Sequence, residues 1–491
     1  MRLSSNSTPL TWDTFANVLR VATPLMVSTG MFSLVLFMDR TMLLWHDPSE
    51  MSAAMASGNL FWTMVCPIVG TVSMTGALVG QLVGAGRQRQ VGSLLWQAVW
   101  LSLISLPLFG LLSLGARTWL ALTDQPENLR DMEAIYFATL MWGGAGEVMQ
   151  TGLAGFYSGI HRTRTVMMVS LISGMVNLIL DAVLIFGLDP AWWGGSGDRI
   201  LEWGIFGAGL ASTISFWFKA VLYAGLLCQP KWRQTYGLFR RWQWHGPMMW
   251  RLIYFGVPAG LMMVTEAGGF TAIVLRIGRL GDVPLQATTM AINFNMIAFI
   301  PLVGLSIATS VLVGQTLIRD GASVARSHVM AALIIGWGYS ASWAIAYGWA
   351  GEFLISLYAV SQDTQNVVAT DVLASGAEVD AAFASRVATG LLGFVSLYVV
   401  FDATQLILAG ALRGAGDTWF VLVASALVSF GAVTIGVVFE PAFDLGLPSD
   451  SPETLNALQF WWWIITGWVL ALLVAMAARY WQGRWQSMRM V

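Results

Sequence analysis

The feature that most constrains this chain is a series of about twelve apolar runs, each long enough to cross a lipid bilayer. A helix needs about 20 apolar residues to span the hydrocarbon core, and backbone groups in lipid must pair within their own segment. The runs therefore predict membrane-spanning helices. They fall near residues 18–45, 52–80, 94–116, 133–159, 166–188, 204–228, 251–277, 285–317, 328–357, 388–412, 419–440 and 458–480.

Composition agrees with this interpretation and excludes several other classes of protein. Charged residues make up 11% of the 491 residues, against about 25% in soluble domains. This excludes an ordinary soluble enzyme, a disordered chain and a nucleic-acid-binding protein. Two cysteines, Cys66 and Cys228, cannot form a disulfide framework. We find no signal-peptide pattern and no nucleotide-binding or metal-binding motif, so we expect no cofactor.

The few charges alternate in sign from loop to loop. Positive charge in short loops stays on the cytoplasmic side, which predicts cytoplasmic termini and an even number of spans. We therefore expect a multi-pass protein of the plasma membrane, here a bacterial inner membrane. Basic residues expected on the inner side include Arg87, Arg89, Arg162, Arg164, Lys231, Arg233, Arg251, Arg319, Arg326, Arg413 and Arg479, and acidic residues on the outer side include Asp47, Glu50, Asp131, Glu202, Glu440 and Glu453.

The two halves of the chain align with each other. Six spans in each half give both halves the same orientation, as in transporters built from parallel repeats. The sequence thus predicts an all-α polytopic fold of twelve transmembrane helices in two pseudo-symmetric six-helix lobes, residues 1–228 and 251–491, joined by a cytoplasmic linker, 229–250. At an offset of 234 residues Pro24 aligns with Pro258, Pro67 with Pro301 and Gly70 with Gly304, and at an offset of 255 Gln150 aligns with Gln405 and Gly155 with Gly410.

Five acidic residues fall inside predicted spans. Each costs about 2.5 kcal/mol or more at a helix centre on insertion scales, so each is a candidate functional residue. Lys219 is the cation deepest within a span, and it either extends toward the inner surface or serves as a counter-ion. The five acids are Asp39, Glu147, Asp181, Glu266 and Asp402.

The first candidate cluster belongs to the N-terminal half. Asn177 and Asp181 are four residues apart and share a helix face. Asp39 and the Thr213 hydroxyl could complete an oxygen-rich pocket. Such oxygens suit a hard cation such as Na⁺, or a proton held on a desolvated acid. The alternative is a hydrogen-bond network that only joins helices.

The second candidate cluster belongs to the C-terminal half. Tyr398 and Asp402 share a helix face, and Glu266 lies in another span. Asp402 and Glu266 form a second candidate for binding Na⁺ or the substrate. The repeat places Asp402 opposite Glu147, and each acid is followed after three positions by glutamine, Gln405 and Gln150. Glu147, Gln150 and Gln405 are weaker candidates, and Glu147 could be purely structural.

At this point the chain resembles the multidrug and toxic compound extrusion (MATE) transporters over nearly its full length. The resemblance is carried by the order and spacing of TPLMVSTGMFSLVLFMDR, GALVGQLVGAGR, VNLILDAVLIFG, GAGLAST, FGVPAGL, VGLSIATSVLVGQ and FDATQLILAGALRGAGDT. It implies two six-helix lobes around a central cavity, and an antiporter that exports amphipathic organic cations, antibiotics among them, against inward Na⁺ or H⁺. We expect the protein to act as a monomer.

The resemblance also implies roles for individual residues. Asp39, Asn177, Asp181 and Thr213 match the family's N-lobe cation or proton site. Having the C-lobe acids as well favours the NorM-like branch over the DinF-like branch; these matching residues are Glu266 and Asp402, with Tyr398.

Three alternatives stay open at this stage. A lipid-linked oligosaccharide flippase of the same superfamily would need a cationic cavity, whereas these spans are rich in acids. A channel would need a ring-forming filter, and an enzyme a nucleophile with its base; neither pattern is visible. The sequence leaves the choice between Na⁺ and H⁺ undecided.

Overall fold

The computed structural model describes residues 10–120, 127–188, 200–239, 242–369, 376–441 and 451–491. Within these ranges the chain is helical, apart from turns and a single antiparallel bridge between Leu188 and Ile200. The predicted all-α class is confirmed.

The first group of helices contains α1 to α8. Asp47 begins α2 as its N-cap, accepting a hydrogen bond from the Ser49 amide, and Met74 separates α2 from α3 within one span. The bounds are α1 Trp12–His46, α2 Pro48–Ser73, α3 Thr75–Gly84, α4 Gln88–Leu114, α5 Ala116–Leu120, α6 Glu127–Gly159, α7 Thr163–Phe186 and α8 Gly204–Leu227.

The second group contains α10 to α15 and follows the short helix α9, which falls within the predicted linker. Residues 240–241 of that linker lie outside the described residues. The bounds are α9 Pro230–Tyr236, α10 Gly246–Gly278, α11 Asp282–Arg319, α12 Ala322–Ala369, α13 Gly376–Ala415, α14 Thr418–Phe439, α15 Pro452–Gln482 and the 3₁₀ helix η2 Arg484–Ser487.

In the described part of the chain, eleven helical segments are long and apolar enough to cross a membrane. The twelfth predicted span is α6, which carries the buried polar side chains of Glu133, Glu147 and Gln150. These side chains lower its hydropathy, yet α6 packs between α2, α4 and α8. The twelve-helix polytopic fold is therefore confirmed, and α6 is the least apolar of the spans predicted from the apolar runs.

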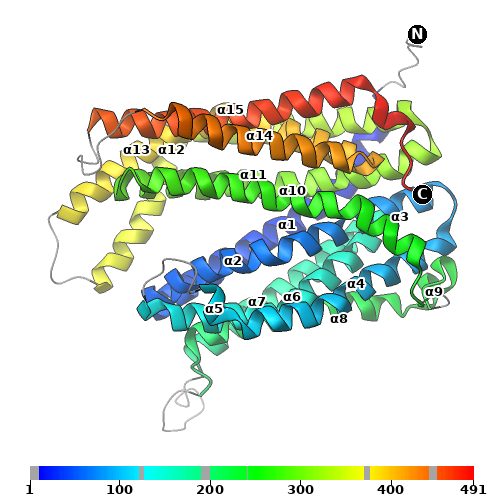
Figure 1. Ribbon diagram of the computed structural model, residues 1–491, viewed down its shortest axis with the longest axis horizontal. Helices are drawn as coiled ribbons and strands as arrows, with labels where there is room; N and C mark the ends of the chain where they lie inside the picture. The colour runs from blue at the N-terminus through cyan, green and yellow to red at the C-terminus, as the bar shows by residue number, and fades with distance from the viewer. Residues whose placement is uncertain (1–9, 121–126, 189–199, 240–241, 370–375, 442–450) are drawn as a thin grey trace.

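The two groups of helices diverge toward one end of the molecule and meet toward the other, where the start of α1 and Val491 lie (Figure 1). Between the groups, α2 packs on α10, and α11 packs on α1 and α3. The exact lobe boundaries remain a prediction.

Backbones touch where the two groups meet. A Cβ atom at Gly70 of α2 would lie 2.8 Å from the Gly260 nitrogen of α10, and one at Gly304 of α11 would lie 2.7 Å from the Met26 nitrogen of α1. The offset that aligns Gly70 with Gly304 also aligns Met26 with Gly260. The two contacts are therefore equivalent under the repeat, which supports a structural origin for the sequence identities.

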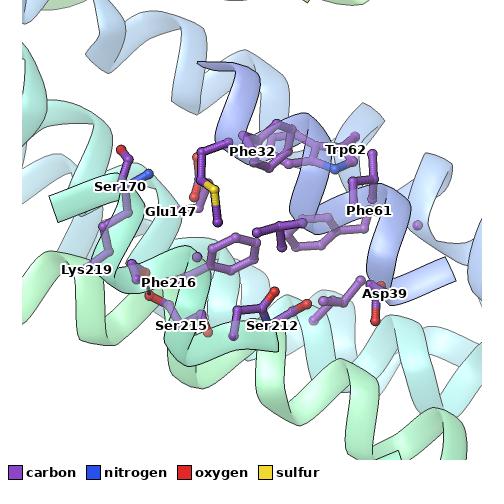
Figure 2. Close-up of a pocket in the computed structure, with 18 of the residues that line it drawn as sticks. Phe32, Asp39, Phe61, Trp62, Glu147, Ser170, Ser212, Ser215, Phe216 and Lys219 are labelled. Atoms are coloured by element: carbon purple, nitrogen blue, oxygen red, sulfur yellow. Dashed lines mark hydrogen bonds between the residues drawn. The ribbon is translucent and has the colours of Figure 1, made fainter. Parts of the chain in front are cut away.

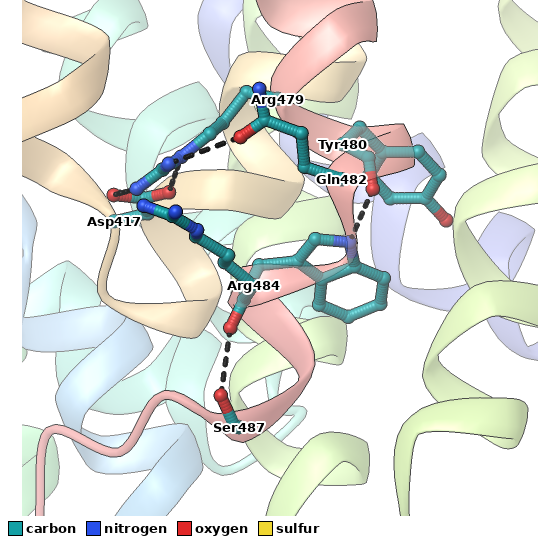
Figure 3. A network of polar contacts seen from close by, with 7 residues as sticks. Asp417, Arg479, Tyr480, Gln482, Arg484 and Ser487 are labelled. Carbon is teal, nitrogen blue, oxygen red and sulfur yellow. Dashed lines mark hydrogen bonds and ion pairs between the residues drawn. The ribbon is translucent and has the colours of Figure 1, made fainter. Parts of the chain in front are cut away.

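The C-terminal segment is folded back on the same end of the molecule (Figure 1), where it takes part in a polar network (Figure 3). The Arg479 guanidinium binds the Asp417 carboxylate with both Nε and Nη2, at 2.6 and 3.1 Å. Helix α15 ends at Gly483, whose φ of 73° suits glycine. Beyond η2, the Met490 amide donates to Oε1 of Gln81 on α3 at 2.8 Å, so the segment joins the two groups of helices.

Candidate functional site

A cavity lies inside the first group of helices, among α1, α2, α6, α7 and α8 (Figure 2). The free space between its lining side chains is about 880 Å³, a volume that includes space open to the exterior. Aromatic side chains line much of the cavity, and charged, amide and hydroxyl side chains also face it. The aromatic residues are Phe32, Phe61, Trp62, Tyr136 and Phe216, and the polar ones include Asp39, Arg40, Glu147, Ser170, Ser173, Asn177, Ser212, Ser215 and Lys219.

Asp39 lines this cavity from α1 and is held by a residue that the sequence did not single out. Tyr136 of α6 donates its hydroxyl to Oδ2 of Asp39 at 3.0 Å. The other oxygen, Oδ1, has no hydrogen-bond partner among the described residues. No sequence pattern marks Tyr136, because a single tyrosine in a span is an ordinary occurrence.

Asp181 lies on α7, is fully buried and interacts electrostatically with Asp39. Neither of its carboxyl oxygens has a hydrogen-bond partner among the described residues. The structure therefore brings the two predicted acids together. Asp181 sits behind the cavity wall rather than on it, since it is not one of the residues that line the cavity.

The other two predicted members of this cluster differ in their surroundings. Asn177 lies one turn before Asp181 and lines the cavity, and its side-chain oxygen and nitrogen lack partners in the described chain. Thr213 of α8 donates its hydroxyl to the Thr139 carbonyl at 2.8 Å. The hydroxyl proton of Thr213 is therefore used in a bond to α6, and only the lone pairs of its oxygen remain available to a cation.

Asp39, Asn177 and Asp181 each carry an unpaired oxygen, and the two carboxyls interact with each other. Such a set fits a hard cation or a proton, because buried carboxylates are costly without a compensating positive charge. A site for a transition metal is a different matter. Across the described residues, no group of three or more His, Cys, Asp or Glu side chains could hold a metal ion.

The far end of the cavity contains Glu147 and Lys219. Oε1 of Glu147 accepts a hydrogen bond from Nε2 of Gln150 at 2.7 Å. Lys219 of α8 lines the cavity and interacts electrostatically with Glu147. This arrangement matches the counter-ion alternative for Lys219 and not the extension of its side chain toward the inner surface.

In the second group of helices, Glu266 of α10 accepts a hydrogen bond from Ser425 of α14 at 2.8 Å. It also interacts electrostatically with Arg413 of α13. Placing Arg413 on a cytoplasmic loop was therefore wrong. The residue lies in the last turn of α13 with its side chain inside the bundle, where Nη2 donates to the Ser306 hydroxyl at 3.0 Å. Its charge is offset there by Glu266, and its Nε has no hydrogen-bond partner among the described residues.

Asp402 of α13 is buried and accepts a hydrogen bond from Nε2 of Gln405 at 3.0 Å. It interacts electrostatically with Glu266 and with Tyr398. The structure thus assembles the predicted acids of the second cluster. The Gln405 contact repeats the one between Gln150 and Glu147, so the acid-to-glutamine spacing noted in the sequence corresponds to one local hydrogen bond in each half.

Comparison of the sequence with known proteins identifies one family. The MatE family model matches residues 24–183 and 258–439. Probable multidrug resistance protein NorM of Xanthomonas campestris pv. campestris is 29% identical over 428 residues, which cover 84% of this chain and 85% of that protein. Multidrug resistance protein PmpM of Pseudomonas aeruginosa is 28% identical over 466 residues, which cover 92% and 88%.

Solved structures share the fold. A structure described as the outward-facing conformation of a multidrug resistance MATE family transporter of the MOP superfamily has a TM-score of 0.76 and 15% identity, and the match covers 99% of this chain and 98% of that one. A crystal structure of MATE in complex with MaL6 gives a TM-score of 0.79 at 14% identity. With the family model covering both halves, the chain belongs to the MatE family of membrane transporters, in its NorM-like branch.

Proposed function

We propose that the protein is a secondary antiporter that exports amphipathic organic cations, including antibiotics, in exchange for inward Na⁺ or H⁺. The names of its relatives, multidrug resistance proteins, support multidrug efflux. The observation that carries the coupling is the pair of interacting buried acids, Asp39 and Asp181, with unpaired oxygens beside an aromatic cavity.

Competition for these carboxyls couples the two fluxes. A proton, a sodium ion and an organic cation each neutralise the same negative charge, so binding of one lowers the affinity for another. Aromatic walls such as Phe61, Trp62 and Phe216 favour flat cations through cation–π contact and apolar burial. The acids of the second group, Glu266 and Asp402, offer a second coupling route.

The proposal includes an orientation. The basic loops lie at the end of the bundle where the chain termini lie, so we place both termini in the cytoplasm. We place the protein in the inner membrane of a bacterial cell. The tight contacts at Gly70 and Gly304 then close the cytoplasmic side, and the diverging helices face outward. Rocking of the two lobes about this contact alternates access.

Export from cells tests the assignment of the acids. We expect Asp39→Asn and Asp402→Asn each to reduce ethidium export from a strain lacking its own pumps by about tenfold or more, because the exchangeable charge is gone. Asp131→Asn is the matched control, since this acid is 73% exposed and lies outside the cavity. Unchanged export from both test variants, at equal membrane expression, would sink the assignment.

Proteoliposomes test the exchange itself. A sodium gradient and a pH gradient are imposed in separate experiments. Ethidium should accumulate against its own gradient in one of them, and the gradient that drives this accumulation identifies the coupling ion. Movement that only follows the ethidium gradient would indicate a channel. Transfer of a fluorescent anionic lipid between leaflets, with no ethidium accumulation, would indicate a lipid flippase.

A further inference from the structure

A second hollow, here called the C-terminal hollow, lies between the start of α10 and the segment that follows η2. The free space between its lining side chains is about 600 Å³, a volume that includes space open to the exterior. Its lining includes two arginines, Arg251 of α10 and Arg489 of the segment. The proposed exchange does not use this hollow, because none of its lining residues belongs to either cluster of acids.

Packing holds the segment that carries Arg489 in a defined position. Before Arg489, the Trp485 ring is 1% exposed and stacks on the ring of Tyr480, with centroids 5.0 Å apart. After it, Met490 is 3% exposed and packs against Gly416, where a Cβ would lie 2.7 Å from Cγ of Met490. Arg489 lies between these two anchors, so its place beside α10 is set by the fold.

The positive charges of the hollow are not offset by a bound acid. Arg251 forms no hydrogen bond or ion pair with any described residue. Arg489 donates only to two main-chain carbonyls of its own segment, at 2.8 and 3.3 Å. Asp417, which lies beyond Gly416, is already bound to Arg479. A terminal carboxylate on Val491, which also lines the hollow, neutralises at most one of the two guanidiniums.

Exposed aromatic rings place the C-terminal hollow at the membrane surface. Helix α14 has 22 residues, about 33 Å at 1.5 Å per residue, which is close to the thickness of the hydrocarbon core. Trp419 in its first turn is therefore at the surface, and it is 44% exposed. The Tyr254 ring lies 5.9 Å from Trp419, and the Trp250 ring 6.3 Å from Tyr254. Such rings are typical of headgroup depth, so their neighbour Arg251 lies there too.

We propose that the C-terminal hollow binds the headgroup of an anionic phospholipid, whose phosphate pairs with Arg251 and Arg489. Guanidinium groups bind phosphate oxygens with parallel, charge-assisted hydrogen bonds. Basic pockets at this depth are suited to anionic headgroups, and Trp250 and Tyr254 offer apolar surface to the acyl chains. The bound lipid holds the segment against α10. Through the contact of Met490 with α3, it also supports the junction between the two groups of helices.

Native mass spectrometry of the purified full chain, titrated with phosphatidylglycerol, tests this proposal. Arg251→Gln and Arg489→Gln should each weaken binding about fivefold, and the two together about thirtyfold, because each removes one cation from the headgroup region. Replacing both arginines with lysine should keep the affinity within about threefold, since the charge remains. Phosphatidylcholine, which has no net charge, should bind the unmodified protein about tenfold more weakly or less.

Arg484→Gln is the matched control, because it removes a positive charge from the same part of the chain without lining the hollow. It should change the affinity by less than about twofold. A loss equal to that of Arg489→Gln would show that general charge attracts the lipid, and would overturn the site. Unchanged binding in the double glutamine variant, or equal affinity of the unmodified protein for both lipids, would also overturn it.

Two further measurements complete the test. Inorganic phosphate at millimolar concentration should not displace phosphatidylglycerol, and displacement would identify a site for free phosphate in place of a lipid. Added phosphatidylglycerol should raise the melting temperature of the unmodified protein in detergent and not that of the double glutamine variant. An equal rise in both would contradict the assignment. None of these readouts uses transport, so their outcome is independent of the proposed export function.

Discussion

The hydroxyl of Tyr136 donates a hydrogen bond of 3.0 Å to the carboxylate of Asp39, which joins α6 to α1 inside the cavity. The bond occupies one carboxyl oxygen and leaves the other unpaired. Tyr136 also interacts electrostatically with Asp181, so one phenol lies within reach of both acids. It therefore holds one carboxyl oxygen of Asp39 in place, while the other, Oδ1, is buried without a hydrogen-bond partner among the described residues.

Tyr136→Phe should weaken coupling without unfolding the protein. Removing a hydrogen bond to a charged group costs about 1.5–3 kcal/mol, so we expect the half-saturating concentration of the coupling ion to change by about tenfold or more. Transport in proteoliposomes over a series of ion concentrations measures this. Tyr157→Phe is the control, because it removes a buried hydroxyl of the same helix that donates to the Tyr223 carbonyl outside the cavity. Equal effects of the two substitutions would contradict the prediction.

The second group of helices has an analogous contact, from Ser425 to Glu266. Ser425→Ala should affect transport in the same direction as Glu266→Gln but by less, about three- to tenfold, since the carboxylate itself remains. Combining the two substitutions should add little to Glu266→Gln alone, because the hydroxyl acts through that acid. Full additivity, measured as ethidium transport, would show that Ser425 acts independently.

The contact between the two groups of helices predicts a contrast between two glycines of α10. A Cβ at Gly260 would lie 2.8 Å from the carbonyl carbon of Pro67, whereas a Cβ at Gly268 would have no atom within 4 Å. Gly260→Ala should thus lower the melting temperature in detergent and reduce export. Gly268→Ala should be neutral or gain up to about 1 kcal/mol from helix propensity. A neutral Gly260→Ala would argue against close backbone packing at this contact.

The ion pair between Asp417 and Arg479 should matter more than one at the surface. Its side chains are 6% and 14% exposed, whereas those of Asp131 and Arg117 are 73% and 78% exposed. Asp417→Asn leaves a buried guanidinium without its carboxylate and should cost about 1.5–3 kcal/mol, seen as a lower melting temperature. Asp131→Asn should have an effect near zero. The reverse order of the two effects would refute this ranking.

Much of the fold could be predicted from the sequence because the bilayer makes secondary structure a local problem. Backbone groups in lipid pair within their own segment, so hydropathy along the chain locates the helices without knowledge of their neighbours. Helix α6 is the least apolar of these segments because it buries Glu133, Glu147 and Gln150, yet the apolar run near residues 133–159 still predicts it. The repeat and the family motifs then identify the architecture.

The sequence by itself also determined which acids deserve attention, since a carboxyl in a span is costly wherever the helices finally pack. Only the tertiary structure decided what each charge faces. Tyr136 and Asp39 are 97 residues apart, and Ser425 and Glu266 are 159 apart. Such contacts depend on how each helix is rotated about its own axis, which is set by packing against its neighbours. For the same reason, Arg413 turned out to lie inside the bundle and Lys219 beside Glu147.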